Sequence, residues 1–218
     1  ECNTAIAQEG MHGDYGANIG KVIAIRKDLP SLLKAYAAAG SDARMNGCEL
    51  PVVINSGSGN QGLTVSVPLI IYTEREHLDK EALYRALVIS NLTAIHLKTE
   101  IGRLSAFCGA VSAGAACGAG LAYLKDASEE VMNHTIVNAL AITSGIICDG
   151  AKASCAAKIA VSVEAGILGY DMYMNGQQFY GGDGIISKGI ENTIHNIGVL
   201  GSQGMASTDQ EIIKIMCE

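Results

Sequence analysis

The chain has 218 residues, a formal net charge of −7 and seven cysteines. A chain of this length can bury a sizeable core without disulfides or metal ions to hold it together. The acidic balance leaves no basic stripe to neutralise phosphates, which argues against nucleic acid as a partner. The cysteines are odd in number and scattered along the chain, so they do not form a disulfide framework, and they favour the reducing cytoplasm. We therefore expect a soluble, cytoplasmic protein that acts on a small molecule.

The pattern along the chain predicts mostly helix. A possible short buried strand begins at Val52, and a turn-rich link covers residues 176–184. Glycines at 40 and 169 are expected to end the helices that precede them, and Ser128 is expected to cap the helix that follows it. Thr208 and Glu211 form a capping-box pattern. Helices are expected over residues 29–39, 63–72, 79–101, 104–124, 131–147, 155–168, 185–197 and 208–216.

Residues 104–124 carry no charge and are long enough to span a bilayer. Their composition is mostly Ala, Gly, Ser and Cys, which inserts poorly into lipid but permits tight helix crossing inside a protein. We therefore expect no membrane association. The predicted fold is a compact multi-helix domain with close-packed Ala/Gly-rich helices and at most short strands.

A glycine-rich polar loop covers residues 55–62, before the helix expected from residue 63. Backbone N–H groups at a helix N-terminus, with Ser and Asn side chains beside them, can bind a carboxylate or phosphate. A plain connecting loop explains the same residues equally well. The spacing matches neither a P-loop nor a dinucleotide fingerprint.

Two thiols lie close in sequence within residues 144–158, at Cys148 and Cys155. On one continuous helix their Cα atoms would be about 10.5 Å apart, too far for one small metal site. Asp149-Gly150 permits a tight turn that would bring them together, with a helix restarting near Ala151. Their spacing fits no common zinc finger, and thiolates without histidine favour iron–sulfur chemistry. Ordinary buried thiols remain the alternative, and for Cys2 and Cys48 that is the expected state.

Charged residues gather at the end of the helix expected over residues 79–101. They are His96, Lys98, Glu100 and Arg103. A solvent-exposed helix end is the simpler interpretation of this cluster, and a role in a binding site is the alternative.

Four long motifs resemble the L-cysteine desulfidase family, which is related to the α-domain of bacterial iron–sulfur L-serine dehydratases. They are SDARMNGCELPVVINSGSGNQGLTVSVP, RALVISNLTAIHLKTEIGRLSAFCGAVSAG, ICDGAKASCAAKIA and GMASTDQEIIKIM. The resemblance implies a 4Fe-4S cluster bound by Cys108, Cys148 and Cys155, with one iron left open. Cys117 is not among the implied ligands. Cys217 is a hypothetical tail ligand for the open iron.

The implied reaction is β-elimination of L-cysteine to pyruvate, ammonia and sulfide. In this family the base is a cysteine in an N-terminal domain, in a Gly-Cys-Thr-Glu-Pro-like motif that this sequence lacks. We therefore expect residues 1–218 to be one cluster-binding domain, the C-terminal part of a longer enzyme, with little or no turnover alone. The expected partners are the amino acid and the N-terminal domain, and a second copy of the chain in a homo-oligomer is a further candidate partner.

The loop in the first motif is the candidate for binding the substrate carboxylate, and Lys152 and His96 are further candidates for contacts in the site. Alternatives are an L-serine dehydratase, a non-catalytic iron–sulfur or amino-acid sensor, and a zinc-stabilised domain with Cys117 or Cys217 as fourth ligand. The candidate loop residues are Asn55, Ser56, Gly57, Ser58, Gly59, Asn60 and Gln61.

Overall fold

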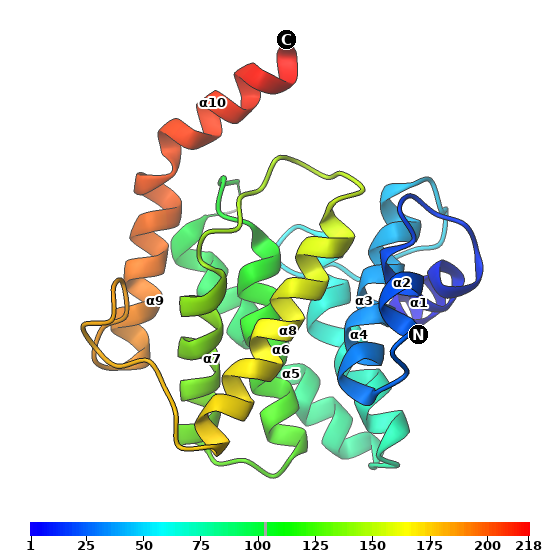
Figure 1. Ribbon diagram of the computed structural model, residues 1–218, viewed down its shortest axis with the longest axis horizontal. Coiled ribbons are helices and arrows are strands. Elements are labelled where there is room, and N and C mark those ends of the chain that lie inside the picture. The colour runs from blue at the N-terminus through cyan, green and yellow to red at the C-terminus, as the bar shows by residue number, and fades with distance from the viewer. Residues whose placement is uncertain (103) are drawn as a thin grey trace.

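The small residues between positions 109 and 124 form the central helix of the computed structural model, which describes residues 1–102 and 104–218. Nearly every residue of this helix, α6, is buried. It packs against α4, α5, α7 and α8, which surround it in Figure 1. Because its own side chains are small, the aliphatic side chains of the surrounding helices fill the core.

The prediction of a mostly helical fold is confirmed, and no strand occurs among the described residues. The only sheet-like pairings in this part of the chain are two isolated bridges. A π-helical turn, Leu200–Gly204, joins the last two helices. The helices are α1 Cys2–His12, α2 Ile19–Ala24, α3 Leu29–Met45, α4 Gly59–Arg75, α5 Lys80–Ile101, α6 Gly109–Leu124, α7 Glu129–Thr143, α8 Cys155–Met174, α9 Ile190–Val199 and α10 Ala206–Cys217.

Close backbone contact between α6 and α8 explains the glycines in both helices. A Cβ atom at Gly114 would lie 2.3 Å from the Ser162 carbonyl oxygen, and one at Gly118 would lie 2.8 Å from the Cα of Gly166. Only glycine fits at such separations. The close-packed Ala/Gly-rich helices expected from the composition are therefore present.

Side-chain caps fix the beginning of three helices. The side chains of Asp28, Asp79 and Ser128 accept hydrogen bonds from the backbone N–H three residues later. Each satisfies one of the N–H groups that a helix start leaves without a partner. The prediction for Ser128 is confirmed. The capping box at Thr208 is wrong, because α10 begins two residues earlier, after Met205, and has no side-chain cap.

Two predicted helix ends are wrong, because the glycines concerned serve helix packing. α3 continues through Gly40, where a Cβ atom would lie 2.9 Å from the side chain of Leu63. α8 continues through Gly169, where a Cβ atom would lie 2.8 Å from the Thr135 carbonyl oxygen. In both cases glycine permits close approach of a neighbouring helix and does not end its own helix.

Other boundaries shift where chain segments leave helical geometry to build a loop. No strand begins at Val52, because residues 52–54 have no partner strand within the described ranges. The central helix begins at Gly109, five residues later than predicted, and α7 ends at Thr143. The helix expected from residue 185 begins at Ile190. Arg103 lies outside the described residues.

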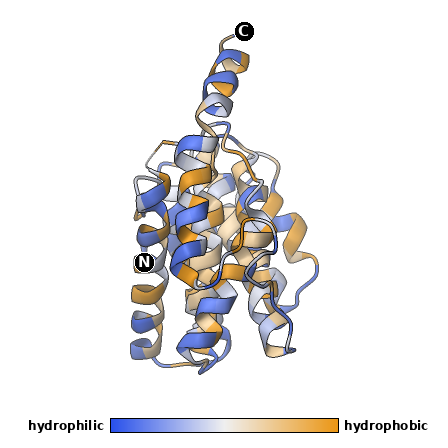
Figure 2. Cartoon of the chain, turned by 90° about the vertical axis from the view of Figure 1, so that its left-hand side faces the viewer, coloured by the Kyte–Doolittle hydropathy of each residue, from blue (hydrophilic) through white to orange (hydrophobic). Residues whose placement is uncertain are grey.

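Helix α10 projects from the body of the molecule, and none of its residues is buried (Figures 1 and 2). Its surface carries both polar and apolar side chains, as the mixed colours near the C-terminus in Figure 2 show. Across the described residues, no helix combines the length and apolar character needed to cross a membrane.

Candidate functional site

Backbone hydrogen bonds hold Cys108 and Cys148 next to each other, although they are far apart in sequence. The Cys108 N–H donates to the Ile146 carbonyl oxygen at 3.2 Å, and the Cys148 N–H donates to the Ala106 carbonyl oxygen at 2.6 Å. These bonds flank an antiparallel bridge between the two segments. Cys108 is also the residue directly before α6, where the positive end of the helix dipole favours a thiolate.

A turn brings Cys155 to the same region. Gly150 adopts φ +91°, a conformation that favours glycine, so the predicted Asp149-Gly150 turn is present. The helix restarts at Cys155, later than the predicted Ala151. The Cys155 Sγ atom lies 3.5 Å from the backbone nitrogen of Lys152 and 3.6 Å from the Gly150 carbonyl oxygen. The first turn of α8 therefore presents this thiol toward the turn.

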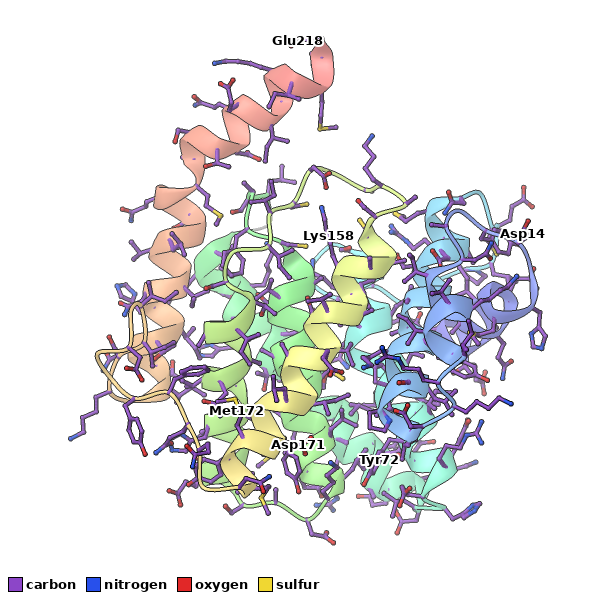
Figure 3. The ribbon with its side chains drawn as sticks, viewed as in Figure 1. Asp14, Tyr72, Lys158, Asp171, Met172 and Glu218 are labelled. Atoms are coloured by element: carbon purple, nitrogen blue, oxygen red, sulfur yellow. The ribbon has the colours of Figure 1, made fainter. Side chains whose placement is uncertain are left out.

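The three thiols and the glycine-rich loop line one cavity of about 320 Å³. We call it the thiol pocket. Figure 3 shows Lys158, which also lines it, near the start of α8, whereas Tyr72 and Asp171 lie at the other end of the bundle. Among its lining residues are Arg44, Ser56, Gly57, Ser58, Asn60, Gln61, Lys98, Cys108, Cys148, Cys155 and Lys158.

The loop closes as a tight turn whose two central residues, Ser56 and Gly57, both have positive φ. Asn55 and Ser58 exchange backbone hydrogen bonds of 3.1 and 3.0 Å across it. Ser58 directly precedes α4 as its N-cap residue, and its side chain makes no capping hydrogen bond. Where the loop lines the pocket, the first N–H groups of α4 and the Ser58 hydroxyl are therefore the groups that can donate hydrogen bonds to an anion.

Two of the predicted loop residues do not line the thiol pocket. Asn55 is buried, and its side-chain amide donates to the Asn91 side chain of α5 at 3.0 Å. This contact anchors the loop to α5. Gly59 lies beneath Arg44, since a Cβ atom there would lie 2.4 Å from the Arg44 Nε atom. Both residues shape the loop without facing the cavity.

Gln61 is the most deeply buried polar side chain of the loop that reaches the pocket. Its Oε1 atom is buried and has no hydrogen-bond partner among the described residues. The amide packs on the start of α6, because a Cβ atom at Gly109 would lie 2.6 Å from the Gln61 Nε2 atom. A buried acceptor without a partner is uncommon, and this one is available to a hydrogen-bond donor that enters the pocket.

Three cations line the pocket, and no Asp, Glu or His is among its described lining residues. Lys158 pairs with Asp149, and the Arg44 Nη1 atom donates to the Asn60 Oδ1 atom at 3.2 Å. Lys98 is only 5% exposed, so the interpretation of this residue as part of a solvent-exposed helix end is wrong. The pocket therefore favours an anionic ligand.

Lys98 faces the pocket because it shares a helix face with apolar residues. Ala94 and Ile101, four residues before it and three after it, are buried on the same side of α5. That spacing is the signal in the sequence from which its burial could have been predicted. Arg44 gives no comparable signal, since it lies in the last turn of α3, where a basic residue is common.

The two further candidates lie elsewhere. His96 is exposed and its Nε2 atom lies 2.9 Å from the Glu191 Oε2 atom of α9, outside the pocket lining. The Lys152 side chain is exposed and does not line the pocket either, although its backbone N–H contacts the Cys155 thiol. The Glu100 Oε2 atom lies 3.0 Å from the His195 Nδ1 atom, and Glu100 is likewise outside the pocket lining.

The electrostatics of the pocket divide the thiols into different states. The neighbouring Cys108 thiol, together with the Gly150 N–H and Lys158, lowers the pKa of Cys148 to about 6. The neighbouring Cys148 thiol and burial raise the pKa of Cys108. Burial lowers the pKa of Lys98. In the metal-free chain, Cys148 therefore ionises at lower pH than Cys108.

The donor set fits a multinuclear cluster better than a single ion. Within residues 1–102 and 104–218, no three His, Cys, Asp or Glu side chains lie close enough together to bind one metal ion. The zinc-domain alternative therefore lacks a preformed tetrahedral site in these ranges. An iron–sulfur cluster is larger and takes thiolate ligands. Three thiols around one cavity, with helix N-termini and cations beside them, suit such an anionic group.

The remaining thiols lie outside the pocket lining. Cys117 is fully buried inside α6, and burial raises its pKa, so it is an inert core residue. Cys217 is exposed near the end of α10. Its neighbour Met216 approaches the turn, since its Cε atom would lie 3.5 Å from a Cβ atom at Gly150.

The fold and the pocket define a helical domain that presents thiols, cations and a glycine-rich helix start around one cavity. Its sequence places it in a family: the model of the serine dehydratase alpha chain family matches residues 1–214, and the chain belongs to that family. The predicted relation to the α-domain of serine dehydratases is confirmed.

Curated relatives carry the uninformative name UPF0597 protein. One from Desulfitobacterium hafniense (strain Y51) is 63% identical over 218 residues, which cover 99% of this chain and 51% of the relative. One from Lachnoclostridium phytofermentans is 54% identical, covering 99% of this chain and 52% of the relative. The chain thus spans about half the length of the curated relatives it matches. No solved structure matches the sequence.

Proposed function

We propose that the chain is the cluster-binding domain of a β-elimination lyase that converts L-cysteine to pyruvate, ammonia and sulfide. The observation that supports it most is the convergence of Cys108, Cys148 and Cys155 with the glycine-rich loop on one pocket. Membership of the serine dehydratase alpha chain family supports a lyase of this general type. The preference for cysteine rests on the resemblance of the motifs to desulfidases.

In this proposal the three cysteines bind a 4Fe-4S cluster, which when bound supplies a Lewis acid for the leaving group. The residues of the chain orient the amino acid. The start of α4, with Ser58 and the backbone N–H groups of Asn60 and Gln61, faces the substrate carboxylate. Lys158, held by Asp149, keeps positive charge beside the thiols.

The overall reaction adds one water: L-cysteine and water give pyruvate, ammonia and hydrogen sulfide. A base removes the α-proton, the C–S bond breaks with its electron pair on sulfur, and the enamine product tautomerises and is hydrolysed. The described pocket lining offers no carboxylate or imidazole as base. We assign the base to another part of the longer enzyme, so this chain alone is expected to show little turnover.

L-Serine is the second candidate substrate, because the matching family is that of the serine dehydratase alpha chain. Its elimination breaks a C–O bond and releases water where cysteine releases sulfide.

All seven cysteines of the chain are free thiols, which suits the reducing cytoplasm that we propose as its compartment.

The relative from D. hafniense provides the test of the reaction, because it is about twice as long as this chain. After anaerobic cluster reconstitution it is incubated with L-cysteine or with L-serine, and pyruvate and sulfide are measured. Pyruvate and sulfide in equal amounts from L-cysteine support the proposal. Pyruvate from L-serine only favours the dehydratase, and no product from either amino acid contradicts both.

A further inference from the structure

Lys98 is a buried charge without a carboxylate partner in the described part of the chain. It lies in the last turn of α5 with 5% of its surface exposed. Other lysines form ion pairs, such as Lys34 with Glu164, but Lys98 forms none among the described residues. Burying an unpaired ammonium group is unfavourable unless a counter-charge is supplied. The burial that lowers its pKa reflects the same cost.

The other two cations of the thiol pocket differ from Lys98 in pairing or in burial. Lys158 contacts the Asp149 carboxylate, whereas Arg44 is only partly buried and donates to the neutral Asn60 side chain. Lys98 is therefore the buried pocket cation without a counter-charge among the described residues. A group that enters the pocket with a negative charge would remove the cost of burying it.

We propose that Lys98 binds the carboxylate of the amino-acid substrate, an inference that rests on the proposed function and names a recognition residue for it. Two anions could meet Lys98: this carboxylate, or the thiolate-bound cluster, since Cys148 and Cys108 lie within electrostatic reach. The thiols already have Lys158 and the N-termini of α6 and α8 beside them. Lys98 is thus the buried cation that remains available for the ligand.

The test compares Lys98→Met, which keeps the length of the side chain and removes its charge, with Lys98→Arg, which keeps the charge. Lys152→Met is the matched control, because Lys152 is a nearby lysine whose exposed side chain does not line the pocket. Each variant of this chain is reconstituted anaerobically, and its iron content and its affinity for L-serine, which lacks a reactive thiol, are measured on the same sample.

Lys98→Met is expected to weaken L-serine binding by about tenfold to a hundredfold, the range for a charge-assisted hydrogen bond. Iron content should stay at the wild-type level, Lys98→Arg should retain most of the affinity, and Lys152→Met should bind as wild type. Ethanolamine, which lacks the carboxylate, should bind wild type and Lys98→Met equally weakly. Because an uncompensated charge is removed, thermal stability should be maintained or raised.

Unchanged L-serine affinity in Lys98→Met overturns the proposal. Loss of iron in Lys98→Met with L-serine binding retained also overturns it, and assigns Lys98 to the cluster. Should the wild-type chain take up no iron, the proposed function fails for this chain. The same comparison on the metal-free chain then decides the role of Lys98, and absence of L-serine binding there as well overturns the inference.

Discussion

Replacing Gly114 by alanine should destabilise the chain, because α6 and α8 cross at this residue with their backbones in contact. A Cβ atom at Gly114 would lie 2.3 Å from the carbonyl oxygen of Ser162 and 2.4 Å from its carbonyl carbon. Backbone atoms cannot rotate away as the end of a side chain can. The two helices would have to move apart along a crossing that includes Gly118 and Gly166.

Two effects of opposite sign determine the size of this change. Alanine inside a helix is favoured over glycine by about 1 kcal/mol. Overpacking of a core by an added methyl group costs about 1–3 kcal/mol, and more when the backbone must shift. Since this contact involves backbone on both sides, we expect a net loss of about 2 kcal/mol. For a chain of this size, that lowers the melting temperature by roughly 4–8 °C.

Urea unfolding followed by circular dichroism measures this loss, with Gly145→Ala as the matched control. A Cβ atom at Gly145 would meet no heavy atom of the surrounding structure within 4 Å, so alanine there should change stability by less than about 0.5 kcal/mol. A Gly114→Ala chain as stable as wild type, or more stable, would show that the helices do not cross as closely as described.

Three further predictions concern single side chains. In the metal-free chain, iodoacetamide should modify Cys148 much faster than the buried Cys117, and the rate at Cys148 should fall as the pH drops below about 6. Peptide mass spectrometry measures both rates, and equal rates would contradict the assigned order of the two pKa values. Burial raises the pKa of Asp42, so the unfolded chain loses the Asp42 proton at a lower pH than the folded chain does. The free energy of unfolding should therefore fall as the pH rises above roughly 4, and urea titrations should show that Asp42→Asn removes this fall. Asp79→Ala removes the cap of α5 and should lower the unfolding free energy by about 1 kcal/mol in the same titrations, whereas a change near zero would mean that the cap contributes nothing.

The sequence predicted helix caps and turns well where they depend only on interactions between residues close together in the chain. The cap at Ser128 and the turn at Asp149-Gly150 follow from side-chain hydrogen bonding and from positive φ, and the structure has both. Gly40 and Gly169 mislead for a physical reason: the sequence cannot tell a glycine that ends a helix from one that a neighbouring helix contacts.

The pocket was predictable only in part, because its walls come from separate helices. Cys148 and Cys155 lie near each other in sequence, and their joint placement could be expected from the turn between them. Cys108 reaches them through a bridge between distant segments, which only the family resemblance indicated. Arg44 was missed and Lys98 was assigned to a solvent-exposed helix end, because charges near helix ends are usually solvent-exposed. The spacing of Lys98 from buried Ala94 and Ile101 indicates its burial, whereas only tertiary packing turns Arg44 toward the cavity.

Iron and sulfide analysis after anaerobic reconstitution tests the central claim most directly. It is made on wild type, on Cys108→Ser, Cys148→Ser and Cys155→Ser, and on Cys117→Ser as the control thiol outside the pocket. The account predicts about four irons per chain in wild type and Cys117→Ser, with iron content sharply reduced in each of the other three variants. A folded wild-type chain without iron, or three pocket variants that retain it, would contradict the assignment of these thiols to a cluster.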